Sequence, residues 1–382
     1  MSLLCDFHLG RACAGPRARG RSGRAGVVFG VVLALLAPSS SSASPARTPV
    51  QILIPEPGNL QLLAFYVALG AGYFESVGLD VSPVSPPSPA LAQGYFTSGE
   101  APVALLPAPV YERLIEERFA FVLVANLLAN DPIDLVVPRA LADARGLTRP
   151  ESLADRLRAM KGLRIGVGPH PRPRLVALFA SQGLDVDSLL KVVVVPGKEQ
   201  EEALASGEVD ALYTHTPFLE DALVDQGAVV VVDQSRGEVP ELTGRQIHVL
   251  GVARTFAQAH PAVVRALVAA IAHGEALVHA NAGAATDAVL RALPSRDRAH
   301  VERLVALYAP AVPTTPRVTT RAIVKELAFY PDGAQPPDLR GIELDRFVAA
   351  EPAHQRGKLA FPLAVLVAVL GMIAALIFRE NH

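Results

Sequence analysis

Ten short runs rich in β-branched residues alternate with helical stretches between residues 49 and 252, and this alternation constrains the fold more than any other feature. Such alternation is typical of a parallel α/β sheet with helices on both faces. The predicted strands are Val50–Ile54, Leu79–Val84, Pro102–Leu106, Phe121–Ala125, Ile133–Val137, Leu163–Val167, Lys191–Val195, Val209–Tyr213, Ala228–Val232 and Ile247–Val252. The helices expected between them include Leu60–Ser76, Pro107–Glu117, Arg172–Gln182, Lys198–Ala205 and Pro217–Gln226.

Sequence motifs recur in the same order in two halves of this region. Gly78–Val81 (Gly-Leu-Asp-Val) returns 105 residues later as Gly183–Val186, and Ser98–Glu100 (Ser-Gly-Glu) returns 108 residues later as Ser206–Glu208. The glycine that opens each longer motif suits a helix end with positive φ. Chance similarity among αβ turns is the alternative. The shared order and near-constant offset favour two similar α/β lobes that face one another across a ligand cleft.

The remaining elements complete a plan of six segments. Helical patterns continue to about residue 330, and a stretch rich in proline and glycine follows them. We expect the crossovers Leu135–Arg139 and Thr243–Val249 to act as hinges. The predicted segments are a signal peptide (1–43), the first part of lobe 1 (49–137), lobe 2 (138–242), a return to lobe 1 with C-terminal helices (243–330), a linker (331–358) and a transmembrane helix (359–378).

The N-terminal segment has the pattern of a secretory signal peptide. Five arginines and one acidic residue precede the 13-residue apolar run Ala25–Ala37, and a serine-rich stretch follows it. A basic start, a short apolar run and a small-residue cleavage site are typical of such signals. At about 1.5 Å per residue, the run is too short to cross a bilayer core of about 30 Å. A core helix with a basic flank is the alternative.

The C-terminal segment predicts a membrane anchor. Leu359–Phe378 contains 20 residues without a charge, and a helix of this length spans about one bilayer core. A buried core helix is the alternative, but it would normally show a polar face. Local charges favour an external C-terminus, because Arg356 and Lys358 precede the helix and only Arg379 follows it. The N-terminal signal should outweigh these local charges, because the large domain is exported before the last helix emerges. We therefore predict a single-pass cell-membrane protein with residues 44–358 on the extracytoplasmic side.

Composition excludes several classes of function. The formal net charge is −2, and about −6 without residues 1–43, so a phosphate-backbone binder is not expected. Both cysteines, Cys5 and Cys13, lie in the predicted signal peptide, which leaves no disulfide framework or cysteine-based metal site. The sequence contains no Gly-x-Ser-x-Gly elbow, phosphate loop or zinc-protease helix motif. The sequence therefore contains no motif for catalysis or for a cofactor, and we expect neither.

Four stretches in order resemble one family of solute-binding proteins, which serve ABC importers of nitrate, sulfonates, taurine and thiamine-pyrimidine precursors. They are Ala64–Val81, Met160–Val167, Ala205–Ala211 with Pro217, and Phe256–Pro261. The resemblance covers roughly residues 49–295. It implies a two-lobed periplasmic-binding-protein fold of type II that captures a small-molecule solute without turnover. The expected partners are ABC permease subunits and, through the C-terminal helix, the membrane, but no nucleic acid; we expect a monomer.

Two other functions remain open. Many family members are soluble or lipidated near the N-terminus, so a C-terminal anchor also fits a solute sensor or accessory binding domain that is not coupled to import. Some relatives make the thiamine pyrimidine with a cysteine-rich stretch. The predicted mature chain contains no cysteine, which disfavours that enzyme.

Candidate ligand-binding residues follow the strands, because ligands of parallel α/β sheets lie beyond the carboxyl ends of the strands. After the first strand, Asn59 fits a helix N-cap, and Gln61 and nearby backbone N–H groups would face the cleft. A simple turn is the alternative. Asn126, which follows Phe121–Ala125, is a weaker candidate.

The second lobe offers a richer set of candidates after two of its strands. The loop Gly168–Arg174 contains three prolines and brings two arginines to a helix start, where positive charge is unfavourable. This mismatch suggests anion capture, and solvated surface arginine is the alternative. The segment after Val209–Asp210 offers a ring for stacking, hydroxyl groups and an imidazole. The candidates in this lobe are His170, Arg172, Arg174, Tyr213, Thr214 and His215.

The ligand and metal predictions follow from these loops. Arginine beside a helix N-terminus favours a small organic anion, such as a sulfonate or carboxylate, over a neutral pyrimidine. His170, His215 and His248 all fall near strand ends and could form a metal cradle. No acidic residue stands at ligand spacing beside them, so we expect no metal there.

Overall fold

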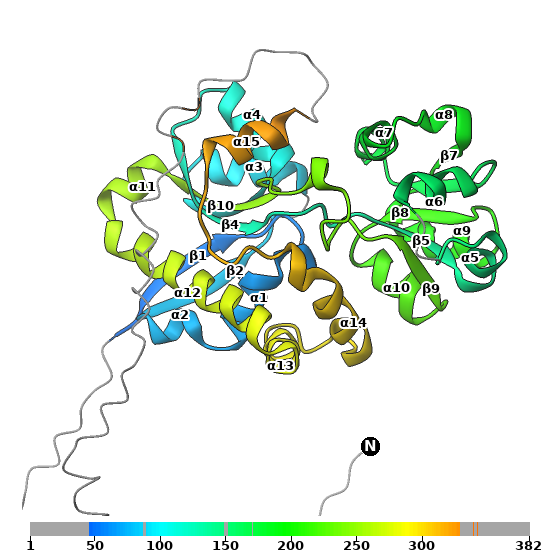
Figure 1. Cartoon of the computed structure of the whole chain (residues 1–382). Helices are drawn as coiled ribbons and strands as arrows, with labels where there is room; N and C mark the ends of the chain where they lie inside the picture. Colours follow the sequence, from blue (N-terminus) through cyan, green and yellow to red (C-terminus); the bar gives the residue numbers. More distant parts are fainter. Residues whose placement is uncertain are drawn as a thin grey trace, which may run out of the picture. The chain divides into compact units, whose positions relative to one another are not determined.

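The computed structural model describes residues 46–86, 89–148, 152–169 and 171–328, together with residues 339 and 342 (Figure 1). The predicted signal peptide (1–43) and transmembrane helix (359–378) lie outside the described residues, as does nearly all of the predicted linker (331–358). These three predictions therefore stay predictions.

Within the described residues, ten strands form two five-stranded sheets, and each strand lies at or near a predicted run (Figure 1). The first sheet has the order β2 (Leu79–Val84), β1 (Thr48–Leu53), β3 (Val103–Pro107), β10 (His248–Ala253), β4 (Phe121–Leu128). The second has the order β7 (Lys191–Val194), β6 (Arg164–Val167), β8 (Ala211–Thr214), β5 (Asp134–Pro138), β9 (Ala228–Val232).

The two sheets share one plan. In each, three strands have the same order, β2-β1-β3 or β7-β6-β8, and the fourth position is taken by the strand that arrives from the other lobe, β10 or β5. Gly78 and Gly183 occupy equivalent turns with φ of +83° and +67°, as the repeated motif predicts. The sheets are mixed rather than purely parallel, because β10 runs antiparallel to β3 and β4, and β5 antiparallel to β8 and β9.

The first crossover lies earlier in the sequence than its predicted hinge, whereas the second overlaps the predicted hinge Thr243–Val249. The predicted hinge Leu135–Arg139 falls on β5, whose backbone pairs with β8 and β9 in the second sheet. A hinge there would break this ladder. The chain instead passes between the sheets over residues 129–133, between the end of β4 and the start of β5, whereas the predicted boundary between the lobes follows residue 137. It returns over residues 233–247, before β10 begins at His248.

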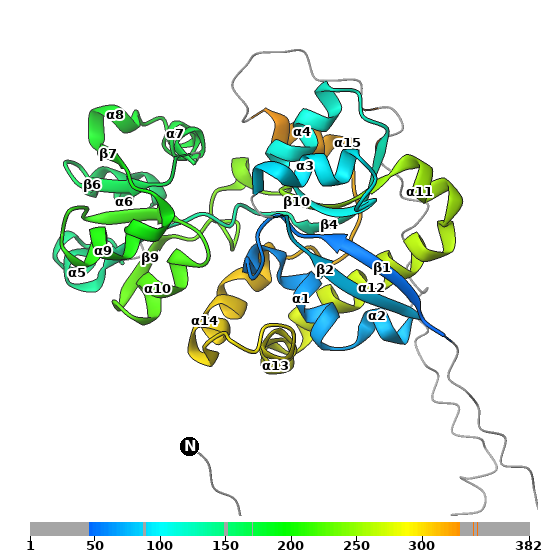
Figure 2. The same ribbon diagram turned by 180° about the vertical axis from the view of Figure 1, so that it is seen from behind.

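Helices cover both faces of each sheet (Figures 1 and 2). On the first sheet, α1 (Leu63–Gly70), α2 (Tyr73–Ser76), α12 (Pro261–Ala280), α13 (Ala282–Ala292) and α14 (Arg298–Tyr308) lie on one side, and α3 (Pro89–Thr97), α4 (Ala108–Glu116) and α15 (Thr320–Leu327) on the other; α11 (Arg254–Ala259) follows β10. On the second sheet, α5 (Arg139–Arg145), α6 (Leu153–Ala159), α7 (Arg172–Ser181) and α8 (Val186–Leu189) face α9 (Gln200–Ala205) and α10 (Phe218–Val224) across the sheet. Short 3-10 turns are η1 (Leu60–Leu62), η2 (Gly197–Glu199), η3 (Pro240–Leu242) and η4 (Ala309–Ala311).

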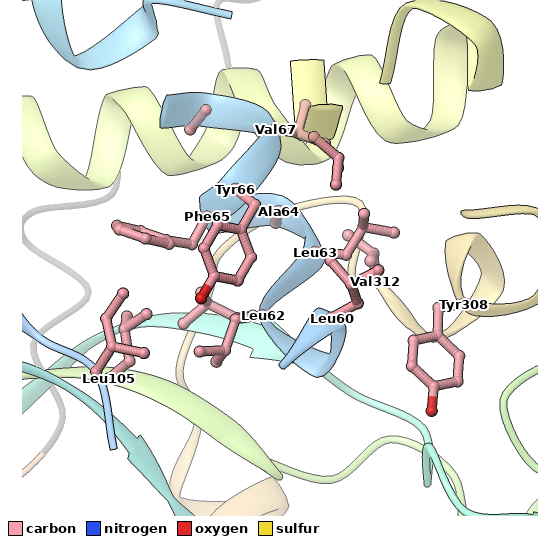
Figure 3. Close-up of a cluster of buried hydrophobic side chains, with 14 of the residues drawn as sticks. Leu60, Leu62, Leu63, Ala64, Phe65, Tyr66, Val67, Leu105, Tyr308 and Val312 are labelled. Carbon is pink, nitrogen blue, oxygen red and sulfur yellow. The ribbon is translucent and has the colours of Figure 1, made fainter. Parts of the chain in front are cut away.

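The largest core lies around α1, between the first sheet and α12 (Figure 3). Residues 63–68 of α1 are all buried, and each large apolar side chain buried in this way contributes about 1.5–3 kcal/mol. Among the described residues, α12 is the one helix long and apolar enough to cross a membrane. It packs against α1, α2 and α13 as a core helix, and it is not the predicted C-terminal anchor.

Candidate functional site

A cavity of about 260 Å³ lies between the two sheets, at the ends of strands from both lobes. The loop after β1, the end of β3 and the start of β10 form its wall on the first lobe, and the loops after β6 and β8 form the opposite wall. The first crossover closes one side. The lining residues are Pro55, Glu56, Asn59, Gln61, Leu62, Leu105, Pro107, Ala108, Pro109, Val110, Pro132, Ile133, Pro171, Arg174, His215, Ile247 and His248.

On the first lobe, the predicted residues Asn59 and Gln61 both line this cavity. The Oδ1 atom of Asn59 caps η1 by accepting the Gln61 backbone N–H at 2.9 Å, and its Nδ2 donates to the Glu56 carboxylate at 2.8 Å. Gln61 Oε1 lies 2.5 Å from His248 Nε2. Because an amide oxygen can only accept, Nε2 of His248 is the donor.

His248 also lines the cavity, although the sequence suggested it only as a metal ligand. Burial lowers its pKa to about 3, so the ring is neutral. With its proton on Nε2, the buried Nδ1 atom is an acceptor, and it has no hydrogen-bond partner among the described residues.

On the second lobe, His215 lies on the cavity wall as predicted. Its Nδ1 donates to the Thr216 carbonyl at 2.7 Å. Burial lowers the pKa of His215, which keeps the ring neutral and leaves Nε2 as an acceptor. The cavity wall therefore carries two neutral imidazole rings, one on each lobe, and the acceptor on His215 is the one that is not buried.

The two arginines of the second-lobe loop have different surroundings. Arg172 is half-exposed, pairs with Asp187 at 2.6 Å and does not line the cavity. Arg174 does line it, but its guanidinium lies 3.3 Å from Asp131 and 2.8 Å from Glu326. Burial alone would raise the pKa of Asp131, yet Arg174 and Arg245 hold it below its usual value. Arg174 therefore faces the cavity with its charge already paired.

Two further predicted residues, Tyr213 and Thr214, lie outside this cavity. Tyr213 and Thr214 line a second cavity of about 300 Å³, which shares Glu56, Pro171 and His215 with the first. Tyr213 is fully buried, and its hydroxyl accepts from Gln234 Nε2 at 2.8 Å. Thr214 donates to Gln200 Oε1 at 2.5 Å.

Asn126 lines neither cavity, and His170 lies outside the described residues. Asn126 is buried in β4 and accepts the Leu128 backbone N–H at 3.3 Å.

Sequence reasoning missed several residues around the cavity. The rule that ligands lie beyond strand ends located Asn59, and it applies equally to the end of β3. The same rule could therefore have predicted Pro107 and its neighbours as lining residues. The partners of Arg174 were not, because Glu326 lies 152 residues away on α15. No local pattern in the sequence connects two such residues.

Potential metal ligands come together away from both cavities. One ligand atom from each of Asp221 on α10, Asp225 at its C-terminal end and His300 on α14 lies within 4.8 Å of the others. His300 Nε2 is 2.9 Å from Asp225, and its Nδ1 is 3.0 Å from Asp297. Within the described part of the chain, this is the one group of side chains with the spacing of metal ligands, and it includes neither His215 nor His248.

Comparisons with known proteins give the family and the fold. The family model of the NMT1-like family matches residues 60–292, which is more than half of the chain. A sequence search of curated proteins finds no match. Three solved structures illustrate the structural likeness.

The alkanesulfonate-binding protein SsuA from Xanthomonas axonopodis pv. citri, bound to MOPS, is 16% identical with a TM-score of 0.51, and the match covers 75% of this chain and 92% of that one. For the periplasmic aliphatic sulphonate binding protein SsuA from Escherichia coli, the identity is 15%, the TM-score 0.54 and the coverage 74% and 90%. The desulfurization enzyme DSZB is 18% identical with a TM-score of 0.53 and coverage of 80% and 97%.

These findings confirm the resemblance stated from the sequence motifs. At such low identities, the structural matches show the fold alone, whereas the family match covers most of both lobes. The chain therefore belongs to the NMT1-like family, and its two-sheet α/β fold is that of periplasmic sulfonate-binding proteins of ABC import systems.

Proposed function

We propose that this protein captures a small solute between its two lobes for an ABC importer, without catalysis. The observation that carries the proposal is the cavity of about 260 Å³, whose walls come from loops of both sheets. A site divided between two lobes can close around a ligand by hinge motion, here at residues 129–133 and 233–247. ABC permease subunits are the partners, and we expect the capturing unit to be a monomer.

The fold alone does not separate binding from catalysis, because DSZB has it too. The cavity is lined by neutral imidazoles, amides, prolines, aliphatic side chains and the Glu56 carboxylate, and its arginine is paired with carboxylates. The chain's two cysteines, Cys5 and Cys13, precede the first sheet. This set supports recognition by shape and hydrogen bonding rather than nucleophilic chemistry.

The charges on the wall favour an uncharged ligand or a cation over the organic anion that the arginines in the sequence suggested. Arg172 lies outside the cavity, and Arg174 is balanced by acidic partners. Glu56 adds a carboxylate that makes no ion pair among the described residues. Acceptors on His215 and Glu56 call for a ligand with N–H or O–H donors, and the apolar residues around them for a compact body.

A ligand screen tests the proposed function. We expect at least one small uncharged or cationic nitrogen compound to raise the melting temperature of the purified full chain. Saturation at 100 times Kd adds about 2.7 kcal/mol of stability. His215→Ala should weaken this binding about tenfold, because a hydrogen bond contributes about 1 kcal/mol and the ring also forms part of the wall. Arg172→Ala is the matched control and should leave affinity unchanged. A loss of affinity with that variant would mean that the ligand binds at the exposed loop 168–174 and not in the cavity.

Membrane attachment is the second part of the proposal. We expect the full chain to sediment with membranes and to resist carbonate extraction, and a chain ending at residue 350 to be released into the soluble fraction. Protease added to intact spheroplasts should degrade residues 44–358. Full-length protein in the soluble fraction would contradict the anchor. The genes beside this one separate the two functions. Permease and ATPase genes would favour import, and a gene for a signalling protein in their place would favour an anchored solute sensor.

A further inference from the structure

Four buried or nearly buried charged side chains form a group next to the cavity. Asp131 comes from the first crossover, Arg245 from the second, Arg174 from α7 and Glu326 from α15. The side chains of Asp131, Arg245 and Glu326 are fully buried, and that of Arg174 is 14% exposed. Arg174 is thus the one member of this group that lines the cavity.

The group is electrically balanced, with two guanidinium groups and two carboxylates. Each arginine contacts both acids: Glu326 lies 2.8 Å from Arg174 and 3.2 Å from Arg245, and Asp131 pairs with both as well. If Glu326 were uncharged, two arginines would face one carboxylate, and the excess positive charge would lie beside the cavity.

The helix α15 holds Glu326 in place. Ile323 is buried in the core that includes α4 of the first lobe, and Lys325 donates to the Thr243 and Pro240 carbonyls of the second crossover. Arg174 belongs to the second lobe, so its contact with Glu326 joins the lobes. A carboxylate fixed in this way competes with any free anion as a tethered ligand of high local concentration.

We infer that Glu326 is a specificity-determining residue: by occupying Arg174 it excludes anionic solutes from the cavity and reserves the site for uncharged or cationic ones. This inference rests on the proposed function, because it assigns the charge selectivity of the same cavity. The residue acts through Arg174 and does not itself line the cavity.

Three planar probes of nearly equal shape test the inference: benzoate, benzamide and benzamidine, which carry negative, zero and positive charge. The expected result for Glu326→Gln is a rise of at least tenfold in the benzoate-to-benzamide affinity ratio relative to the wild-type chain. In the double variant Arg174→Gln with Glu326→Gln, the ratio should return to the wild-type value. Glu302→Gln, on the exposed face of α14, is the control and should leave the ratio unchanged. Calorimetric titration of the full chain measures all four proteins.

A folded Glu326→Gln protein with a benzoate ratio within threefold of wild type overturns the inference. Should that variant not fold, Arg174→Gln serves instead, because Arg245 still pairs with both carboxylates. It should raise the benzamidine-to-benzamide ratio at least threefold, and an unchanged ratio overturns the inference equally. If the wild-type chain binds no solute while Glu326→Gln gains benzoate, the selectivity stands and the importer function fails. If benzamide binds and Glu326→Gln has no effect on the ratio, the selectivity fails and solute capture stands.

Discussion

Arg245→Leu is expected to lower the free energy of unfolding by about 3–5 kcal/mol, because it removes one partner from a buried ionic group. The Arg245 side chain is fully buried, and its guanidinium pairs with Asp131 and Glu326. With leucine in its place, two buried carboxylates would share Arg174 alone. Urea denaturation at pH 7, followed by circular dichroism, measures the change as a lower midpoint.

The control for this prediction is another arginine in an ion pair of similar length. Arg172→Leu breaks the contact with Asp187, but both side chains are half-exposed or more. Solvent screens such a pair, so the expected change is below about 1 kcal/mol. Equal losses for the two variants would mean that burial of the four-charge group does not matter to stability.

The fold was predictable where the signal is local. Each strand of the described residues lies at or near a predicted run. The signal is strongest for β4 and β10, because a strand buried on both faces needs apolar residues on both sides. The repeated Gly-Leu-Asp-Val motif marked two equivalent turns. The direction of β10 and β5 was not predictable from such runs, since a strand that arrives from the other lobe looks the same in sequence as one that follows a helix.

The candidate site was predictable only in part, for reasons of geometry. The strand-end rule brought Asn59, Gln61, Arg174 and His215 to one cavity. Arg172 and Arg174 are two positions apart on α7, about 200° around the helix axis, so only one of them can face the cavity. The paired state of Arg174 depends on Glu326, 152 residues away, and it decides the charge of the wall.

One buried acidic residue lies outside the four-charge group. Glu275 on α12 is fully buried, and neither carboxylate oxygen has a hydrogen-bond partner among the described residues. Burial raises its pKa to about 9 from a usual value of 4.5. The native state therefore holds the proton more tightly than the unfolded chain.

Glu275→Gln is accordingly expected to stabilise the protein by about 3 kcal/mol at pH 7. The wild-type contribution is intact below the unfolded pKa of 4.5 and declines as pH rises toward the folded value of about 9, because the unfolded chain releases the proton first. Glutamine keeps the shape and cannot ionise, so the difference between variant and wild type should be near zero at pH 4.5 and grow with pH. Urea denaturation at pH 4.5, 7 and 8.5 measures it. Glu202→Gln, an exposed carboxylate on α9, should shift stability by less than about 0.5 kcal/mol. A pH-independent gain at Glu275 would show that the carboxyl group finds a partner in the folded protein, and a loss would show that the site requires the carboxyl group itself.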